Sequence, residues 1–445
     1  MTSRAFKSVG AARRRRFALT AGSALAIGAM AILTGCAGGG EQEPAATLDP
    51  DEEVTLNFAW WGDASRAERY EAAIDIFEEA NPNITIQTSF AGFGDYWTAR
   101  NTEAASRNLP DVFQMDLAYL AEYGGFGHVV PLDDYFGDLI NVDAIDPSLV
   151  DAGAVDDEVF GLSSSSSTLA TLVNEPLLEQ LGVELPDGQV TWDEWDEFLA
   201  EASAAGAAND PAVYGGQDYT QYFWLFQIWL GQQGLSFIED GELGFDKSDL
   251  VEWWSRSTVL NESGAVMPQE RKAQLDGVDA LGSGEVAADV SWANFLPRFS
   301  EGPAAPELSL LMPPYDDEDN TGMFLKPGLM LSIAANSEHP QQAAKFIDFL
   351  VNDPEVGAIF GMSRGVPASQ TAADGIEATE LDAQILAYQE EVADKLDGAS
   401  PPAVKGLGTL EQTFVAISGD VSYGVTTPEE AADRWFAEAE IALGW

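Results

Sequence analysis

Residues 54–90 read VTLNFAWWGDASRAERYEAAIDIFEEANPNITIQTSF, and this stretch decides the class of fold. Val, Leu, Phe and Trp stand at alternate positions of residues 54–60, which predicts a strand, and Gly62-Asp63 follows it as a turn. Apolar residues at helical spacing then predict a helix, which Asn81-Pro82 ends before a second strand at residues 84–90. A strand, a helix and a strand in this order form a β-α-β unit. The chain is therefore expected to be an α/β protein with a parallel sheet.

Strands and helices continue to alternate downstream. Hydrophobic periodicity predicts further strands at residues 112–115, 169–173 and 329–334, and helices at residues 95–107, 117–123, 174–181, 341–351 and 427–443. Thr191 and Glu194 have the spacing of a capping box, so another helix is expected to begin there. Residues 217–260 are rich in aromatic side chains and are expected to be helical, whereas the serine run at residues 163–167 is expected to be a loop.

The N-terminus has the order of charge and hydrophobicity that is typical of an export signal. Six basic residues and no acid precede an apolar stretch at residues 17–33, which is short for a membrane span. The stretch ends in Leu33-Thr34-Gly35-Cys36, which resembles the bacterial lipobox, and Cys36 is the only cysteine of the chain. We therefore expect residues 1–35 to be a signal peptide and Cys36 to be acylated. Arg14-Arg15-Arg16-Phe17 also resembles a twin-arginine signal, so the export route stays open.

The chain behind the leader is expected to consist of a tether and two lobes. Residues 36–53 are rich in Gly, Glu, Pro, Ala and Asp, cannot form a core and should be a flexible tether. Removal of the leader would leave 410 of the 445 residues, which is more than one hydrophobic core usually holds. With its one cysteine acylated the chain would have no disulfide, so its stability would come from packing.

The chain is strongly acidic. It has 21 Lys and Arg against 74 Asp and Glu, a net charge of −53; without the six basic residues of the leader, 15 remain and the net charge becomes −59. Such a charge excludes nucleic acid as a partner, because binding to nucleic acid depends on the neutralisation of phosphates. It also disfavours anionic ligands, although a local pair of arginines would override the overall field.

No metal and no cofactor is expected. The acidic residues 316–320 lack the glycine that a calcium-binding loop has at its sixth position, and a solvated loop is the simpler interpretation. His128 and His339 lie far apart, each without neighbouring ligand-type residues. The sequence contains neither a Walker A pattern nor a Gly-x-Ser-x-Gly nucleophile elbow.

Short segments, each weak alone, occur in a common order between residues 60 and 367. They are Trp60-Trp61-Gly62-Asp63, residues 77–83 (FEEANPN), Asp95-Tyr96-Trp97, residues 109–116 (LPDVFQMD), Gly284-Glu285, Ser291-Trp292-Ala293-Asn294, Ala335-Asn336-Ser337, residues 343–355 (AAKFIDFLVNDPE) and Arg364-Gly365-Val366-Pro367. In this order they resemble the family 1 extracellular solute-binding proteins, which include the maltose-binding protein. Two departures bear on the ligand: Val173-Asn174 replaces the family's frequent Tyr-Asn, and the serine run replaces a mixed loop.

The resemblance implies a two-lobed periplasmic-binding-protein-like fold of the class II type, with a hinge between the lobes. The N-terminal lobe is expected to comprise residues 54–163 plus 322–366, and the C-terminal lobe residues 164–321 plus 367–445. Gly161, Gly322 and Gly365 stand at or near the implied crossovers, where glycine absorbs changes in backbone angle at least cost. The ligand is expected at the carboxyl ends of the strands.

Matched position by position, the family's motifs imply four ligand-binding residues. Asp63 and Asp116 would accept hydrogen bonds from sugar hydroxyls, Trp292 would stack on a sugar ring, and Asn294 would be an amide partner. Neutral sugars need paired donors and acceptors as well as flat apolar surfaces, and these residue types supply both. Asp63 has a second interpretation, because it would also cap the helix that follows it.

Six further residues are candidates on weaker grounds. Trp61, Tyr96, Tyr222 and Trp224 are expected as aromatic surfaces, Ser167 as a polar group facing the cleft, and Arg364 as a forked donor to a hydroxyl or an acidic sugar. Core packing stays open for Tyr222 and Trp224. Pairing with one of the many acids stays open for Arg364.

The resemblance implies that the chain is the lipid-anchored substrate-binding component of an ABC importer, which captures a sugar or an oligosaccharide by hinge closure. Its partners would be ABC permease subunits with their cytoplasmic ATPase. Its place would be the outer face of the cytoplasmic membrane, to which the lipid on Cys36 holds it. It is expected to be a monomer and not an enzyme.

Two alternatives stay open. A secreted glycoside hydrolase also lines its cleft with aromatic rings and carboxylates, and turnover of the bound sugar would distinguish it. A receptor for a non-sugar solute, such as a polyamine or a peptide, is the second alternative. A polyamine would suit the acidic charge but would need several convergent acids, which these motifs do not supply.

Overall fold

The computed structural model describes residues 52–186, 188–239, 242–275, 278–396 and 404–444. The segment Leu48–Trp445 forms one compact unit. The predicted signal peptide, Cys36 and most of the predicted tether lie outside the described residues. Within the described part, no helix has both the length and the apolar composition that a membrane crossing requires.

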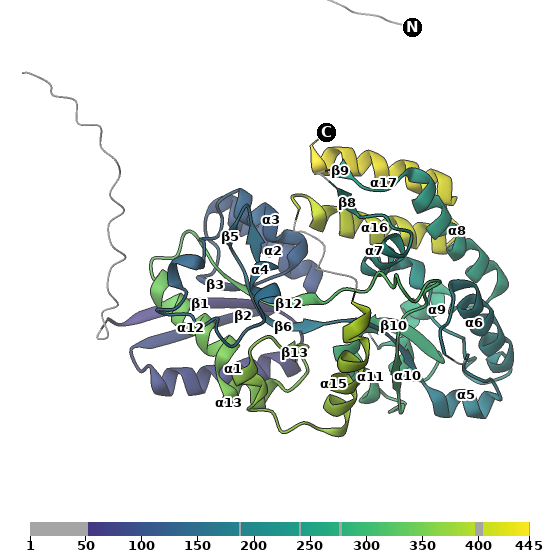
Figure 1. Ribbon diagram of the computed structural model, residues 1–445, viewed down its shortest axis with the longest axis horizontal. Coiled ribbons are helices and arrows are strands. Elements are labelled where there is room, and N and C mark those ends of the chain that lie inside the picture. Colours follow the sequence, from purple (N-terminus) through teal and green to yellow (C-terminus); the bar gives the residue numbers. More distant parts are fainter. Residues whose placement is uncertain (1–51, 187, 240–241, 276–277, 397–403, 445) are drawn as a thin grey trace, which may run out of the picture. The chain divides into compact units, whose positions relative to one another are not determined.

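The larger of the two main sheets has six strands in the order β13-β6-β12-β3-β1-β2 (Figure 1). Its strands are β1 (Val54–Trp61), β2 (Ile84–Ala91), β3 (Val112–Met115), β6 (Leu162–Ser167), β12 (Lys326–Ile333) and β13 (Val366–Pro367). β1 pairs in parallel with β2 and β3, which confirms the predicted β-α-β unit. β12 runs antiparallel to β3 and β6, so the sheet is mixed where a parallel sheet was expected. The long connection from β6 to β12 does not impose the parallel direction that a β-α-β crossover does.

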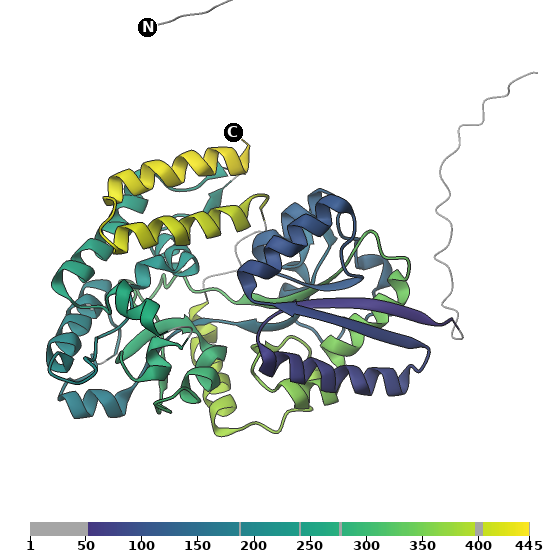
Figure 2. The ribbon, with the colours of Figure 1, turned by 180° about the vertical axis from the view of Figure 1, so that it is seen from behind.

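Helices cover both faces of this sheet. They are α1 (Ala64–Ala80), α2 (Phe93–Ser106), α3 (Leu117–Gly125), α4 (Pro147–Asp151), α12 (Pro340–Asn352), α13 (Pro354–Phe360) and α14 (Gln370–Ala373). Leu56, Phe58 and Trp60 of β1 are fully buried in one cluster with α1 and α12. Ala59 points to the other face and packs in a cluster with α2 and α3. Figure 2 shows α1 alongside β1 and β2 at the N-terminal, purple end of the described chain.

The β1-α1-β2 unit forms for reasons that its sequence displays. Asp63 caps α1, because its Oδ1 accepts a hydrogen bond from the Arg66 N–H at 3.0 Å. Tyr70 and Phe77 lie on the buried face of the helix. At the other end, the Asn81 side chain donates to the Phe77 carbonyl at 2.8 Å. The interpretation of Asp63 as a helix cap is therefore confirmed.

The serine run forms the buried strand β6, so the expectation of a loop was wrong. The hydroxyls of the run bind neighbouring backbone: Ser164 Oγ donates to the Leu329 carbonyl at 2.8 Å, and Ser165 Oγ donates to the Arg364 carbonyl. A small side chain that satisfies its own hydroxyl in this way is tolerated inside a sheet. Sequence reasoning missed the strand because serine carries no hydrophobic periodicity.

The second sheet has three strands in the order β10-β7-β11, and both outer strands are antiparallel to β7. The strands are β7 (Leu169–Val173), β10 (Ala288–Trp292) and β11 (Ser309–Leu311). The helices that follow in this part are α5 (Glu175–Leu181), α6 (Trp192–Gly206), α7 (Phe223–Gln232), α8 (Lys247–Ser263), α9 (Gln269–Gln274), α10 (Ala280–Ser283), α11 (Leu296–Ser300), α15 (Glu380–Val392), α16 (Leu407–Ser422) and α17 (Pro428–Leu443). Two small hairpins pair β4 (Ala154–Val155) with β5 (Glu158–Val159) and β8 (Ile238–Glu239) with β9 (Glu242–Leu243).

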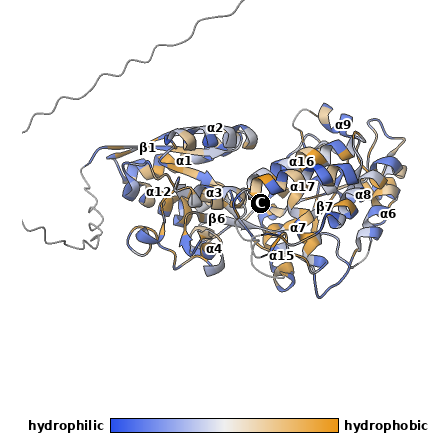
Figure 3. Cartoon of the chain, turned by 90° about the horizontal axis from the view of Figure 1, so that it is seen from above, coloured by the Kyte–Doolittle hydropathy of each residue, from blue (hydrophilic) through white to orange (hydrophobic). Residues whose placement is uncertain are grey.

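Most of the helices and strands that the sequence predicts in this part are present. β7 has the predicted bounds, and the capping box of Thr191 and Glu194 opens α6. The aromatic stretch is helical in two pieces, α7 and α8, with β8 and β9 between them. α16 and α17 lie side by side (Figures 1 and 3), and each has buried apolar residues at helical spacing as well as hydrophilic ones, as amphipathic helices do.

The chain passes between the two sheets without an intervening helix. Only Thr168 separates β6 from β7, and Ser167 at the end of β6 still pairs with Lys326 at the start of β12. Residues 312–325 lead from β11 back to β12. The exact lobe boundaries given above remain a prediction.

Candidate binding site

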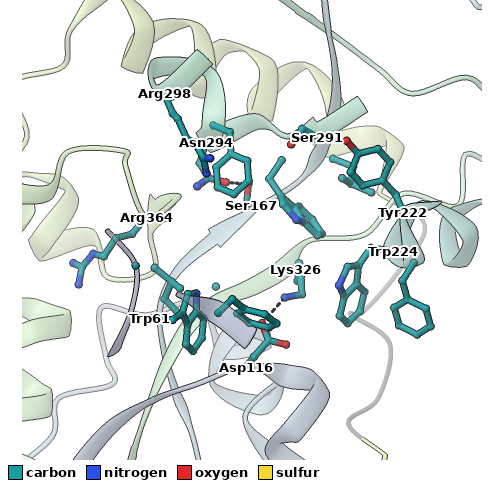
Figure 4. Close-up of a pocket in the computed structure, with 18 of the residues that line it drawn as sticks. Trp61, Asp116, Ser167, Tyr222, Trp224, Ser291, Asn294, Arg298, Lys326 and Arg364 are labelled. Carbon is teal, nitrogen blue, oxygen red and sulfur yellow. Dashed lines mark hydrogen bonds and ion pairs between the residues drawn. The ribbon is translucent and has the colours of Figure 1, made fainter. Parts of the chain in front are cut away.

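A cavity of about 620 Å³ has walls that come from both sheets (Figure 4). Trp61 ends β1, Asp116 follows β3, Ser167 ends β6 and Trp292 ends β10. Lys326 begins the antiparallel strand β12 and therefore reaches the same place from the opposite direction. Pockets for small organic ligands usually measure about 300–1,000 Å³, so the cavity has the size of a binding site.

The cavity brings together nine of the ten predicted binding residues. They are Trp61, Asp63, Asp116, Ser167, Tyr222, Trp224, Trp292, Asn294 and Arg364. Lining a cavity is a position and not a contact with a ligand. The roles predicted for these side chains therefore remain predictions.

Tyr96 is the exception, and the prediction that it offers a surface to the ligand is wrong. Its side chain is 1% exposed, and its hydroxyl donates to the Gln114 carbonyl at 2.7 Å. Its ring packs edge-on against Trp61, with ring centroids 5.4 Å apart. The face of α2 that carries Tyr96 is turned to the sheet, so Tyr96 supports the Trp61 indole from behind.

Lys326 stands among the aromatic rings of the cavity, although sequence reasoning did not single it out. Its Nζ lies 4.6 Å from the ring centroid of Trp224 and 5.5 Å from that of Trp292. The same Nζ forms an ion pair with Asp116 Oδ2 at 3.0 Å, and both side chains are 12% exposed. Asp116 Oδ1 also caps α3 by accepting from the Ala118 N–H. Asp116 is thus held by two partners, and the ammonium group is held by rings and carboxylate together.

Glu411 of α16 is a further carboxyl group that the sequence did not suggest. It accepts a hydrogen bond from Trp224 Nε1 at 2.9 Å, which fixes the plane of that indole. Burial raises the pKa of Glu411 to about 7, and the charge of Asp116 raises it as well, whereas Lys326 and the hydrogen bond act in the opposite direction.

Polar side chains complete the wall on the side of the second sheet. Ser167 Oγ donates to Asn294 Oδ1 at 2.9 Å, so β6 and the turn after β10 are tied together at the cavity. The Tyr222 hydroxyl donates to Asp289 Oδ2 at 3.3 Å. Burial raises the pKa of Asp289 to about 6 and raises that of Tyr222. These groups offer hydroxyl and amide atoms to a ligand that can exchange hydrogen bonds with them.

Arg66 lies across the turn that follows β1. Its Nη1 donates to the Trp61 carbonyl at 2.9 Å. A Cβ at Gly62 would stand 2.8 Å from Arg66 Cδ, so the side chain can take this path only because position 62 is a glycine. Trp61, Gly62 and Arg66 all line the cavity.

Arg364 is 6% exposed, and its guanidinium carbon lies 3.8 Å from the ring centroid of Phe360. Burial lowers its pKa, and the neighbouring Arg66 and Arg69 lower it further, whereas Tyr70 raises it. Within the described residues it forms no ion pair and its Nη1 has no hydrogen-bond partner, so the alternative that Arg364 pairs with an acid finds no support there. Figure 4 shows its guanidinium directed away from the indoles of Trp224 and Trp292.

Arg298 of α11 lines the cavity from the side of the second sheet. Its Nε pairs with Asp279 at 2.9 Å, while 54% of its side chain stays exposed.

None of the sequence motifs includes any of four charged side chains of this wall, Arg66, Arg298, Lys326 and Glu411. Only 15 basic residues lie outside the predicted signal peptide. This scarcity is the one sequence signal that would have drawn attention to Arg66, Arg298 and Lys326.

No group of three or more His, Cys, Asp or Glu side chains in the described ranges is arranged to hold a metal ion. The site is instead one of rings, hydroxyls, amides and charged side chains.

A profile of the bacterial extracellular solute-binding proteins matches residues 63–356. The chain belongs to this family. The match begins at the turn after β1 and ends in α13, so it includes most of the elements that build the cavity. Since the family is extracellular, the protein acts outside the cytoplasm.

Solved structures of such proteins have the same fold. One is an extracellular solute-binding protein of family 1 from Alicyclobacillus acidocaldarius, with 27% identity, a TM-score of 0.62, and coverage of 89% of this chain and 100% of that one. A periplasmic oligogalacturonide-binding protein from Yersinia enterocolitica, in complex with saturated digalacturonic acid, has 21% identity, a TM-score of 0.76 and coverage of 88% and 99%. The GacH receptor of Streptomyces glaucescens, solved unliganded and with acarbose, has 19% identity, a TM-score of 0.72 and coverage of 88% and 99%. These likenesses confirm the two-lobed α/β fold.

Proposed function

We propose that this solute-binding protein captures a saccharide in the cavity and delivers it to an ABC importer. The observation that carries the proposal is the presence of the Trp61, Trp224 and Trp292 indoles in one cavity of about 620 Å³. The C–H faces of sugar rings pack on flat aromatic surfaces, and sugar hydroxyls need polar partners, which Ser167 and Asn294 offer. Related proteins whose structures contain digalacturonic acid or acarbose support the choice of a saccharide.

Capture would proceed by closure of two lobes, residues 54–163 with 322–366 and residues 164–321 with 367–445. Trp61 belongs to the six-stranded sheet and Trp292 to the three-stranded sheet, so a ligand that touches both favours the conformation in which both are close. The importer would recognise this closed form. Small-angle scattering should record a smaller radius of gyration with saturating ligand than without it, and an unchanged radius would argue against closure.

The lipid on Cys36 would hold the protein, as a monomer, on the outer face of the cytoplasmic membrane. The resemblance of Leu33-Thr34-Gly35-Cys36 to a lipobox supports this location at the membrane. The partners would then be the permease subunits and their cytoplasmic ATPase. Substitution Cys36→Ser should release the protein from the membrane fraction, and retention of the variant there would contradict the anchor.

Hydrolysis of the saccharide is a second candidate, because the cavity wall contains two carboxyl groups, Asp116 and Glu411, and burial raises the pKa of Glu411 as in a glycosidase's general acid. Both groups are already engaged, however. Asp116 binds Lys326 and caps α3, and Glu411 accepts from Trp224. We therefore propose binding without turnover, and the saccharide should be recovered unchanged after long incubation.

A polyamine fits this cavity poorly. Such a ligand needs several free carboxylates, whereas the acids in this wall are bound to Lys326, to a helix N-terminus or to an indole. The Lys326 ammonium already occupies the space between Trp224 and Trp292 where a ligand cation would bind best.

A thermal-shift screen tests the proposal. The soluble chain from Glu41 onward, which contains the whole compact unit Leu48–Trp445, is heated with mono-, di- and oligosaccharides, alditols, polyamines and amino acids. One group of saccharides should raise the melting temperature, the substitution Trp292→Ala should abolish that rise, and Tyr423→Ala, at an exposed ring outside the cavity, should preserve it. A rise in melting temperature with a polyamine or a peptide, and none with any saccharide, would contradict the proposal.

A further inference from the structure

The wall of the cavity is richer in positive charge than the rest of the chain. Four of its residues are basic, Arg66, Arg298, Lys326 and Arg364, and three are acidic, Asp63, Asp116 and Glu411. The whole chain has 21 basic and 74 acidic residues. Basic residues thus outnumber acidic ones among these seven side chains, whereas acidic residues far outnumber basic ones in the chain.

The acids of the wall do not neutralise this charge. Asp116 balances Lys326 in a direct ion pair at 3.0 Å. The raised pKa of Glu411 leaves that group partly protonated near neutral pH. Asp63 is exposed and caps α1. Asp279, which does not line the cavity, pairs with Arg298 at 2.9 Å. The positive charge that remains in excess is therefore that of Arg66 and Arg364.

Three arginines that are not exposed lack an ion pair with any described carboxylate, and two of them, Arg66 and Arg364, line the cavity. The three are Arg66, Arg69 and Arg364. Arg69 binds the carbonyls of Ile359 and Phe360, which explains its position, although Arg69 itself does not line the cavity. Burial of an unpaired charge is costly, and proteins usually retain it only where something else meets that charge.

Arg66 is the group best placed to meet a ligand. Within the described residues its side chain makes one hydrogen bond, from Nη1 to the Trp61 carbonyl. The other guanidinium nitrogens, Nε and Nη2, are therefore available to a ligand. Burial lowers the pKa of Arg66, and the charges of Arg298 and Arg69 lower it further against the opposite effects of Tyr70 and Asp63. Arg66 of α1 and Arg298 of α11 line the same cavity, so a ligand that fills it can meet both side chains.

We propose that the captured saccharide is acidic and that its carboxylate, as in a uronic acid residue, binds between Arg66 and Arg298. An anion there would satisfy the unpaired charge of Arg66 and accept hydrogen bonds from it and from the exposed part of Arg298, whose Nε is held by Asp279. Because one arginine comes from an element beside each sheet, the anion also links the two sheets. The inference rests on the proposed function and narrows its ligand class.

This inference opposes the expectation that a net charge of −53 disfavours anionic ligands. The overall field is screened over about 8–10 Å in physiological salt, whereas two guanidinium groups at a partly buried wall act at contact distance. The local charge therefore decides which ligand is bound, and the surrounding acidity slows the approach of the ligand.

The experiment compares a matched pair of ligands by titration calorimetry on the soluble chain from Glu41 onward. One ligand is a di- or trisaccharide of a uronic acid, and the other is its methyl ester, which keeps the shape and removes the charge. The acid should bind at least tenfold more tightly than the ester, since hydrogen bonds to a charged group typically contribute about a factor of ten or more. The difference should shrink as salt is raised.

The substitutions Arg66→Gln and Arg298→Gln should each remove most of the preference for the acid while binding of the ester stays nearly the same. Arg434→Gln is the matched control, because Arg434 is an exposed arginine paired with Asp420 and does not line the cavity. It should keep the full preference. Unfolding curves recorded for each variant separate loss of binding from loss of fold.

Three results would overturn the inference in distinguishable ways. Equal affinity for acid and ester, or for neutral saccharides, would remove the acidic ligand and leave saccharide capture standing. Tighter binding of a sulfated or phosphorylated saccharide than of the uronate would replace the carboxylate by another anion. Absence of binding to any saccharide, with binding of a solute of another class, would remove both the inference and the proposed function.

Discussion

At the scale of single residues, the stacking role of Trp292 is the sharpest prediction. Trp292→Phe should weaken binding of the saccharide a few-fold, and Trp292→Ala should weaken it at least tenfold, because removal of a central aromatic group from a binding site costs about 2 kcal/mol or more. Titration calorimetry measures both dissociation constants. Equal affinities for the wild type and the alanine variant would show that the ring is only part of the lobe.

Glu411 gives a prediction about pH. Its pKa is raised from 4.5 to about 7 in the folded state, so the native protein binds more protons than the unfolded chain between these values. The stability that Glu411 contributes is therefore complete below about pH 4.5 and is lost as pH rises through about 7. Glu411→Gln keeps an acceptor for Trp224 Nε1 but cannot ionise.

Relative to the wild type, the glutamine variant should gain about 1–2 kcal/mol of unfolding free energy as pH rises from 4.5 to 7, less than the full shift would give, because Glu411 as a residue is only half-buried. Urea unfolding at several pH values measures this difference. Asp289, whose pKa is also raised, is present in both proteins and cancels. A difference that does not vary with pH would contradict the burial of an ionisable Glu411.

The site was predictable where one short motif places a side chain at the end of a strand. Trp61 and Asp63 follow β1 directly, and alternation alone points Trp61 opposite to the buried Trp60. Arg66 was missed because its place in the cavity depends on residues that are distant in sequence. Lys326 was missed because its ion pair with Asp116 depends on the antiparallel direction of β12, which was not predicted. Glu411 was missed because α16 was not predicted at all, so no argument placed it near Trp224.

At the scale of elements, the sequence predicted those helices and strands whose hydrophobic pattern or cap is local. β3 and β7 have the expected bounds, and Thr191 caps α6 as its spacing with Glu194 indicated. β6 was not predicted, because its serine hydroxyls donate to carbonyls of β12 and of the segment before β13. These partners are distant in sequence, so no local pattern indicates them. The antiparallel direction of β12 is likewise a property of the whole chain.

Gly365, directly before β13, tests how tightly this edge of the sheet is built. Its φ is 106°, and a Cβ there would stand 2.4 Å from the Ser166 carbonyl oxygen. Gly365→Ala should cost about 1–3 kcal/mol of unfolding free energy, because both the backbone angle and the contact oppose a side chain. Gly419→Ala in the interior of α16 meets nothing within 4 Å and should be neutral or stabilise by up to about 1 kcal/mol. Chemical unfolding of both variants measures the contrast, and equal effects would contradict this description of the edge.

At the scale of the whole molecule, two sheets of different construction supply one cavity. The six-stranded sheet contributes Trp61, Asp116 and Lys326, and the part around the three-stranded sheet contributes Trp224 and Trp292. A ligand bound by both parts couples its own binding to their relative position. An importer that reads this position would thereby distinguish the loaded protein from the empty one.

Equilibrium dialysis of the purified protein against the saccharide selected by the thermal screen, with chemical analysis of the ligand on both sides, tests the central claim most directly. The account predicts that about one saccharide is retained per chain, that it is recovered unchanged, and that Trp292→Ala retains far less of it. Retention of no saccharide under any condition, or recovery of a cleaved product, would contradict saccharide capture by this protein.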